Sequence, residues 1–140
     1  MKDKAFLDSN ILIYLYSEDE LEKQNIVNSI FDKFECVIST QTLNEFCNVC
    51  LKKLKKNVSE IIESLNEIKG SCRLEFVDDL VMERALLLHE KYSYSYFDSL
   101  MLSSALKYNC AIIYSEDMQH EQLIESSLKI INPFLGRVCP

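Results

Sequence analysis

Short apolar runs alternate along the chain with longer segments whose apolar residues recur every three or four positions. That spacing is typical of a helix that buries one side. Five such stripes predict five helices: Ile26, Val27, Ile30, Phe31 and Phe34; Leu43, Phe46, Cys47, Cys50, Leu51 and Leu54; Val58, Ile61, Ile62, Leu65 and Ile68; Val81, Met82, Ala85, Leu86, His89 and Tyr92; and Leu100, Met101, Ala105 and Tyr108. Asn57 and Glu60 stand at capping-box spacing ahead of the third.

The apolar runs between these stripes predict five strands: Lys4 to Leu7, Cys36 to Ser39, Leu74 to Val77, Cys110 to Tyr114, and Leu128 to Ile131. Strands that alternate with helices indicate βαβ units and a parallel sheet covered on both faces. We therefore expect residues 1–140 to form a single α/β domain, a three-layer α/β/α sandwich around a mainly parallel five-stranded sheet. Ligands of such sheets bind beyond the carboxyl ends of the strands.

Composition narrows the class of protein. The 140 residues are 48% hydrophobic and 26% charged, with only two Gly and two Pro, an ordinary globular balance. We find no secretory signal and no apolar run of about 18 residues, so we expect a cytoplasmic protein without a membrane span. The net charge of −7 counts against a broad basic face for nucleic acid. A nuclease whose acids bind metal ions remains compatible with that charge.

The cysteines fit a reducing compartment better than a disulfide framework. Cys47 and Cys50 are spaced like a metal or redox pair, but they lie on an apolar helical stripe and no second pair follows. We therefore expect them to pack in the core. The remaining cysteines are Cys36, Cys72, Cys110 and Cys139.

Four acidic residues stand where a site at the sheet edge would need them. Asp8 ends the first strand, Glu45 lies early in the helix after the second, Asp98 opens a later helix, and Asp117 follows the fourth strand. Each also has a structural explanation: Thr42 with Glu45 and Ser95 with Asp98 have capping-box spacing, Asp8 could cap a helix and Asp117 could belong to a turn. Together, however, four acids at one edge would repel one another unless a cation neutralised them.

The chemistry that suits such a cluster is phosphodiester hydrolysis. Mg²⁺ and Mn²⁺ prefer carboxylate and water oxygens, whereas Zn²⁺ would favour the His and Cys that this cluster lacks. A bound Mg²⁺ lowers the pKa of a water, orients the phosphodiester and stabilises the charge of the transition state.

The blocks that carry these acids resemble the PIN domain, and more narrowly the VapC-type toxins of bacterial toxin–antitoxin pairs. They are Phe6 to Leu12, Ile38 to Phe46, Tyr96 to Leu100 and Tyr114 to His120, in an order that spans nearly the whole chain. One departure is Glu121, where relatives often carry Gly after the Gln-His pair, which puts the local turn in question.

The resemblance implies Mg²⁺- or Mn²⁺-dependent endoribonuclease activity on RNA, a homodimer, and neutralisation by a small antitoxin. It assigns Asp8, Glu45, Asp98 and Asp117 to the acidic metal site, directly or through water. Asn10 and Ser115 would support them, and Glu116 is a weaker candidate for that supporting role. We expect Glu45 to bind or position the attacking water. The number of metal ions and the target RNA stay open.

Two other functions are compatible with parts of the pattern. The first is a PIN-like module that only binds a partner, although all four acids are present. The second is a phosphatase with an Asp nucleophile, but such enzymes usually place a second Asp two residues on, where this chain has Asn10.

For several further residues, we compared a structural interpretation with a functional one. The basic run at Lys52, Lys53, Lys55 and Lys56 is interpreted as a solvated helix end rather than an RNA clamp. His89 is expected to be structural, and His120 to be either a surface residue or a substrate contact. Tyr94 and Tyr96, just ahead of Asp98, are the aromatic residues selected as candidates for substrate contact.

Overall fold

A six-stranded sheet forms the centre of the computed structural model, which describes residues 2–135. The strand order is β3-β2-β1-β4-β6-β5, and every pair is parallel except β5 with β6. β1 is therefore an inner strand, with β2 on one side and β4 on the other. The strands are β1 Lys4–Leu7, β2 Glu35–Ser39, β3 Arg73–Glu75, β4 Ile112–Tyr114, β5 Leu123–Ile124 and β6 Leu128–Ile131.

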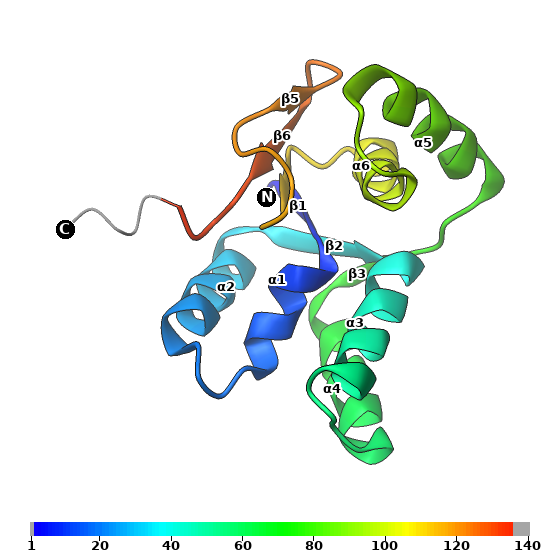
Figure 1. Cartoon of the computed structure of the whole chain (residues 1–140). Coiled ribbons are helices and arrows are strands. Elements are labelled where there is room, and N and C mark those ends of the chain that lie inside the picture. Colours follow the sequence, from blue (N-terminus) through cyan, green and yellow to red (C-terminus); the bar gives the residue numbers. More distant parts are fainter. Residues whose placement is uncertain (1, 136–140) are drawn as a thin grey trace.

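Helices cover both faces of this sheet, as Figure 1 shows. The first group, α1 to α4, lies on one face, and α5 and α6 lie on the other. This is the predicted three-layer α/β/α arrangement. The helices are α1 Ser9–Ile13, η1 Tyr14–Tyr16 (a 3₁₀ turn), α2 Leu21–Lys33, α3 Thr40–Lys52, α4 Val58–Ser71, α5 Asp79–Tyr92 and α6 Tyr96–Lys107.

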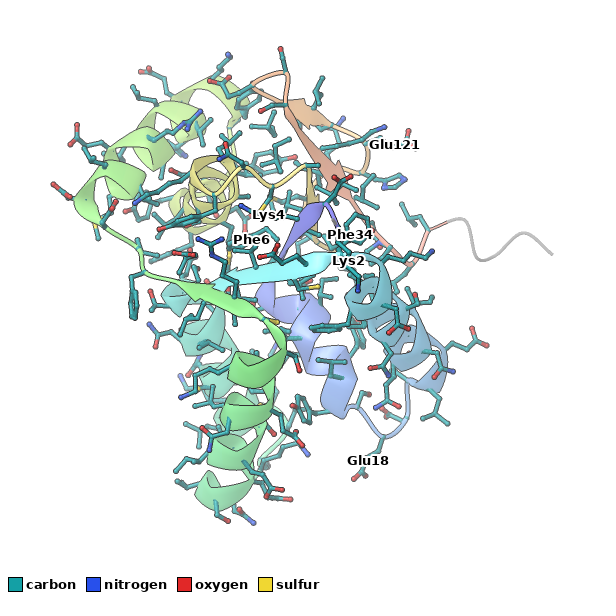
Figure 2. All side chains as sticks on the ribbon, turned by 180° about the vertical axis from the view of Figure 1, so that it is seen from behind. Lys2, Lys4, Phe6, Glu18, Phe34 and Glu121 are labelled. Atoms are coloured by element: carbon teal, nitrogen blue, oxygen red, sulfur yellow. The ribbon has the colours of Figure 1, made fainter. Side chains whose placement is uncertain are left out.

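Side-chain alternation along the inner strands divides the core in two. Ala5 and Leu7 of β1 pack with α1 to α4, whereas Phe6 packs with α6 on the opposite face. Figure 2 shows Phe6 from behind, close to the middle of the molecule. Because β1 is buried on both faces, its sequence is a continuous apolar run that ends at Asp8.

Three short elements were not predicted. The five-residue helix α1 and the three-residue turn η1 follow β1, and the two-residue strand β5 makes the sheet six-stranded rather than five-stranded. All three are too short to show a period. The strand predicted at Leu74 to Val77 is Arg73–Glu75, and the one predicted to begin at Cys110 begins at Ile112.

The buried side of α5 was also predicted only in part. Val81, Ala85 and Leu88 are buried, but Met82 and Leu86 are exposed, as is His89, whose Nδ1 contacts the Tyr94 carbonyl. The inward face therefore follows the spacing 81, 85 and 88 rather than the apolar stripe in the sequence. The exposed leucines leave an apolar surface on this helix.

Helix capping leaves the candidate acid Glu45 free for other contacts. The capping box predicted for Thr42 and Glu45 is wrong, because Ser39 is the N-cap of α3 and forms the box with Thr42. Glu45 thus lies in the second turn, and its carboxylate does not cap the helix. At α6, Ser95 caps the helix by accepting from the Asp98 N–H. The box of Asn57 and Glu60 on α4 is confirmed.

The described cysteines are free thiols, and the core-packing prediction holds for the Cys47 pair. Cys50 is buried and Cys47 is half-buried against the same apolar cluster. Burial raises the pKa of Cys36 and Cys110 to about 12, which keeps both thiols protonated and unreactive. Cys139 lies outside the described residues. Within residues 2–135, no helix is long and apolar enough to cross a membrane.

Candidate active site

Asp8 is the most buried of the four candidate acids, with 4% of its surface exposed at the carboxyl end of β1. Its backbone is extended and its side chain caps α1, where Oδ1 accepts from the Ser9 N–H at 2.7 Å. The other oxygen, Oδ2, accepts from the Ser115 hydroxyl at 2.8 Å. Burial nevertheless raises the pKa of Asp8 to about 6, and the charges of Glu45 and Asp98 add to the increase.

Glu45 reaches the site from α3 and is held by two donors. The Ser9 hydroxyl donates to Oε1 and the Gln41 amide Nε2 donates to Oε2, each at 2.9 Å. Since Ser9 Oγ also lies 3.4 Å from Asp8 Oδ1, this one hydroxyl lies between the two carboxylates. Glu45 is thereby fixed facing Asp8.

Asp98 enters from the first turn of α6, on the opposite side of the sheet edge. It is half-buried, and its pKa is raised first by burial and then by the charges of Asp117 and Glu45, against a lowering contact with Ser95. The neighbouring charges that act on Asp98 show that carboxylates from four separate segments gather at one place.

Asp117 lies in the loop after β4 and is held by Asn10, whose Nδ2 donates to its Oδ2 at 2.9 Å. The same Nδ2 lies 3.4 Å from Asp8 Oδ2, so one amide bridges two of the acids. Ser115 has a similar double role, because its hydroxyl donates to Asp8 and accepts from the Asp117 N–H at 3.3 Å. Asn10 and Ser115 thus stand in direct contact with the acids they were expected to support.

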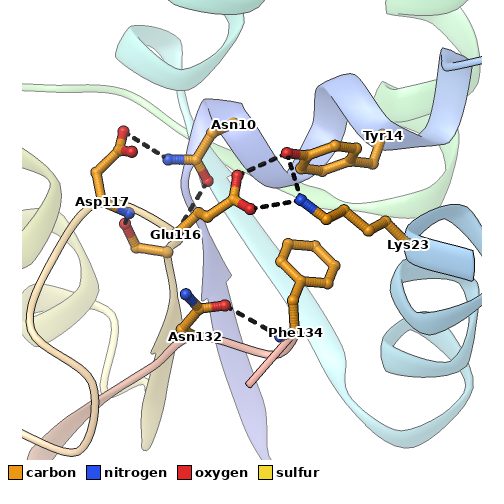
Figure 3. A network of polar contacts seen from close by, with 8 residues as sticks. Asn10, Tyr14, Lys23, Glu116, Asp117, Asn132 and Phe134 are labelled. Atoms are coloured by element: carbon orange, nitrogen blue, oxygen red, sulfur yellow. Dashed lines mark hydrogen bonds and ion pairs between the residues drawn. The ribbon is translucent and has the colours of Figure 1, made fainter. Parts of the chain in front are cut away.

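The carboxylate of Glu116 points away from Asp117, toward Tyr14 and Lys23, as Figure 3 shows. Its carboxylate accepts from the Tyr14 hydroxyl at 2.6 Å and pairs with Lys23 at 2.8 Å. Only its backbone faces the site, where the Glu116 N–H donates to Asn10 Oδ1 at 3.3 Å. That bond orients the Asn10 amide so that its Nδ2 faces Asp8 and Asp117. Glu116 therefore contacts the site through its main chain rather than its carboxylate.

Three residues in contact with these acids were not identified from the sequence: Ser9, Gln41 and Lys23. Gln41 precedes Glu45 by four residues, a spacing that places both on one helix face, and this signal was available. Lys23 pairs with a residue 93 positions away, for which the sequence gives no sign. The Lys23 ammonium also lies over the rings of Tyr14 and Phe134, at 4.7 and 5.0 Å from their centroids.

Gln41 links α3 to the start of α6. The side chain is 8% exposed, and its Nε2 donates both to Glu45 Oε2 and to the Phe97 carbonyl, each at 2.9 Å. Two acceptors on one side fix the orientation of the amide. Its Oε1 is then the one buried side-chain polar atom in the described part of the chain that lacks a hydrogen-bond partner. An acceptor in that state costs about 1–3 kcal/mol.

The other candidate contacts lie around this cluster. Tyr94 is bound through its hydroxyl to Gln119 and Gln122, and Tyr96 packs against Val81, Ala85 and Leu100. His120 faces the chain after β6, where its Nδ1 accepts from the Asn132 N–H at 3.0 Å. In the basic run between Lys52 and Lys56, Lys53 lines a hollow of about 330 Å³ beside Ser9, Asn10 and Asp117.

The acidic cluster fits a hard divalent cation held partly through water. Its donors are carboxylate oxygens, and none of the ion pairs in the described part of the chain involves any of the four acids. Among residues 2–135, no three His, Cys, Asp or Glu side chains stand close enough to hold one ion by themselves. Mg²⁺ is suited to such a site, because it usually keeps several waters and binds one or two carboxylates.

Comparison with known proteins identifies the family and the fold. The sequence profile of the PIN domain matches residues 5–125. No curated protein matches the sequence. Among solved structures, a toxin–antitoxin complex from Klebsiella pneumoniae superimposes with a TM-score of 0.70 at 17% identity, covering 93% of this chain and 98% of that one.

Two further solved structures are similar in fold. The Mycobacterium tuberculosis toxin VapC20, which cleaves the sarcin–ricin loop, gives a TM-score of 0.64 at 16% identity and covers 81% of this chain and 89% of its own. VapBC2 from Rickettsia felis, bound to a fragment of its promoter DNA, gives 0.66 at 16% identity, with coverage of 91% and 98%. At these identities the likeness shows a shared fold.

Proposed function

Because this chain belongs to the PIN domain family, we propose that it is a divalent-cation-dependent endoribonuclease and the toxin of a toxin–antitoxin pair. The observation that carries the proposal is the convergence of Asp8, Glu45, Asp98 and Asp117 at the carboxyl edge of a parallel sheet, where no Lys or Arg of residues 2–135 forms an ion pair with them. The similar folds of the Klebsiella complex and of VapC20 support it.

Each acid would have a distinct part in hydrolysis. Asp8, Asp98 and Asp117 would hold Mg²⁺ or Mn²⁺ directly or through water, and the ion would supply a more acidic water and neutralise charge on the phosphodiester. Asn10 and Ser115 keep the carboxylates of Asp8 and Asp117 in place. Glu45, fixed by Ser9 and Gln41, is placed to accept a hydrogen bond from the attacking water.

Cleavage of a fluorescent single-stranded RNA tests this function directly. Purified protein is assayed in EDTA, Mg²⁺ and Mn²⁺ beside Asp8→Asn, with Asp32→Asn as the matched control because Asp32 is exposed on α2, away from the cluster. We expect cation-dependent cleavage that Asp8→Asn loses and Asp32→Asn retains. Full activity of Asp8→Asn would refute the assignment.

A well-folded protein that cuts no RNA in any cation would favour a binding-only PIN-like module. A rise in melting temperature on adding Mg²⁺ or Mn²⁺, absent in Asp8→Asn, would then still identify the cluster as a metal site, because a ligand of the folded state stabilises it.

The proposed partner is a small antitoxin that carries a basic residue. An arginine placed against these carboxylates would form charge-assisted bonds and compete with the cation. The Klebsiella structure of similar fold is a toxin–antitoxin complex, which supports a protein partner for this chain. Co-purification of the product of a neighbouring small gene, and its loss of inhibition when the basic residue is removed, would test it.

We also propose that the protein forms a homodimer through the exposed apolar side of α5. Leu80, Leu86 and Leu87 are each more than half exposed there, and Phe76 precedes the helix. A group of this kind on one surface is typical of a protein interface. Light scattering of the wild type and of Leu87→Glu would show a dimer that dissociates in the variant.

A further inference from the structure

A hollow beside Glu45 has no part in the chemistry described above. It has a volume of about 280 Å³ and lies between α3 and the start of α6, where Gln41, Asn44, Glu45, Val77, Phe97 and Leu100 line it. We call it the Gln41 pocket. Its volume is at the lower end of the range of roughly 300–1,000 Å³ for small-ligand pockets, which suits one ring system. Whatever occupies it lies next to the acidic cluster.

The apolar side of the pocket includes an aromatic ring that the fold leaves in solvent. Phe97 is 62% exposed, although Tyr96 and Asp98 on either side are partly buried. Its only ring contact in the described chain is with Tyr96, edge-on at 5.4 Å between centroids. An exposed phenylalanine next to a site for nucleic acid offers a face on which a base can stack.

The polar side of the pocket carries an exposed amide. Asn44 lies on α3 with its side chain in solvent and lines the hollow. Gln41 Oε1 also lacks a partner, but protein atoms cover it, so the exposed amide at this edge of the hollow is that of Asn44. Every nucleic-acid base carries an N–H on its Watson–Crick edge that can donate to an amide oxygen.

The charge of the site also decides which part of an RNA can enter. A phosphate would meet the negative charge of Glu45 in this hollow, whereas a base is uncharged. Phosphates are better placed near the cation or on the opposite side, where Lys53 lies. The base therefore fits the Gln41 pocket better than the backbone does.

We propose that the Gln41 pocket binds an unpaired base of the RNA that neighbours the phosphodiester at the acidic cluster. The base stacks on Phe97, and an N–H on its Watson–Crick edge donates to the side-chain amide oxygen of Asn44. This rests on the proposed ribonuclease function and adds a specificity determinant to it. It requires a single-stranded target, because the base edge must be free of its pairing partner.

The test combines a protein variant with a modified RNA. Cleavage of a single-stranded RNA is compared with cleavage of copies in which one residue near the cut is abasic, for wild type, Phe97→Ala, Phe97→Trp and Leu21→Ala. Leu21 is the matched control, since it is 61% exposed, almost as much as Phe97, but lies on α2 and does not line the pocket. RNA affinity is also measured by fluorescence anisotropy, and oligomeric state by light scattering.

We expect Phe97→Ala to raise KM about 5- to 100-fold, the effect of losing one base–aromatic stack, with a smaller change in kcat. Phe97→Trp should retain wild-type KM, and Leu21→Ala should behave as wild type. One abasic position should raise the KM of the wild type by a similar factor but hardly raise the KM of Phe97→Ala any further. Such non-additivity is expected when Phe97 and the missing base contact each other directly.

An unchanged KM and abasic profile in Phe97→Ala would overturn the base site while leaving the ribonuclease intact. A change of oligomeric state in Phe97→Ala without a change in KM would also overturn it, and would assign Phe97 to the contact between copies. If the wild type neither binds nor cleaves RNA in Mg²⁺ or Mn²⁺, the proposed function fails and the base site fails with it.

Discussion

The substitution Asp8→Asn is expected to stabilise the metal-free protein at the same time as it abolishes cleavage. Asp8 is almost fully buried beside other acids, and its pKa is about 6 compared with 3.8 for an unperturbed aspartate. Folding therefore opposes the ionisation of Asp8, and at neutral pH the folded protein carries an unfavourable charge. Asparagine has nearly the same shape and removes that charge.

The size of the effect follows from the two pKa values. A difference of about 2 units at 1.36 kcal/mol each corresponds to roughly 3 kcal/mol. Against this, the new NH₂ group would replace the oxygen that accepts from the Ser115 hydroxyl and the Asn10 amide, a loss of about 1–2 kcal/mol. The Ser9 N–H keeps its acceptor in the variant. We expect a net gain of about 1–2 kcal/mol at pH 8.

The dependence on pH has a definite sign. Below pH 3.8, Asp8 is protonated in both the folded and the unfolded chain and contributes nothing to the difference. Between about 3.8 and 6 the folded protein holds a proton that the unfolded chain has lost, so the wild-type free energy of unfolding falls as pH rises. The advantage of Asp8→Asn therefore grows through this range and is constant above it.

Urea unfolding in EDTA at pH 4 and pH 8 measures the gain in stability of Asp8→Asn and its dependence on pH. With a slope near 2 kcal/mol per M, the midpoint of Asp8→Asn should exceed that of the wild type by roughly 0.5–1 M at pH 8. At pH 4 the advantage should disappear, and saturating Mg²⁺ should reduce it at pH 8 by stabilising only the wild type. A variant no more stable than wild type at pH 8, or a gap equal at both pH values, would refute the reasoning.

Other substitutions test separate features of the fold and the site. Asp117→Asn should lose cleavage, whereas Glu116→Gln should keep most activity and lose about 1 kcal/mol of stability because its ion pair with Lys23 is removed. RNA cleavage and urea unfolding of both variants would show whether the two acids differ as their side-chain directions indicate. Gly70→Ala should gain about 0.5–1 kcal/mol, because Gly70 is in α4 and an added Cβ meets nothing within 4 Å, and an unchanged thermal midpoint would contradict this. Glu121 has a left-handed backbone with φ of 71°, so Glu121→Gly should be neutral or gain up to about 1 kcal/mol of stability, whereas Glu121→Val should lose about 1 kcal/mol. A urea midpoint higher for Glu121→Val than for Glu121→Gly would be inconsistent with strain at this turn.

The long elements and the positions of the acids could be predicted because their signals are local. The stripe of α4 and the box at Asn57 need only a few neighbouring residues, and Asp8 is found because a buried strand ends there. The turn at Glu121 is also a local feature, because its backbone φ is positive, a conformation that Gly adopts with the least strain.

The elements and contacts that were not predicted depend on long-range contacts or backbone geometries for which the sequence contains no recognisable pattern. The hairpin of β5 and β6 turns at Glu125 and Ser126, both with positive φ, without the Asn-Gly signal that usually marks such a turn. The pairing of Lys23 with Glu116, and the bridge from Gln41 to the Phe97 carbonyl, join segments that only the folded chain brings together. The direction of Glu116, and hence its difference from Asp117, followed from such a contact.

The order of the strands also governs when during translation the site can exist. Asn10 and Asp117 are hydrogen-bonded but stand 107 residues apart, and β1 cannot pair with β4 until β4 has been made. At ribosomal speeds of about 5–20 residues per second, a nascent chain displays Asp8 for roughly 5–20 seconds before Asp117 is synthesised. During that interval the proposed nuclease has no assembled site, and the ribosome that makes it is not exposed to its activity. A partner translated nearby has the same interval in which to fold and meet the chain as its site first forms.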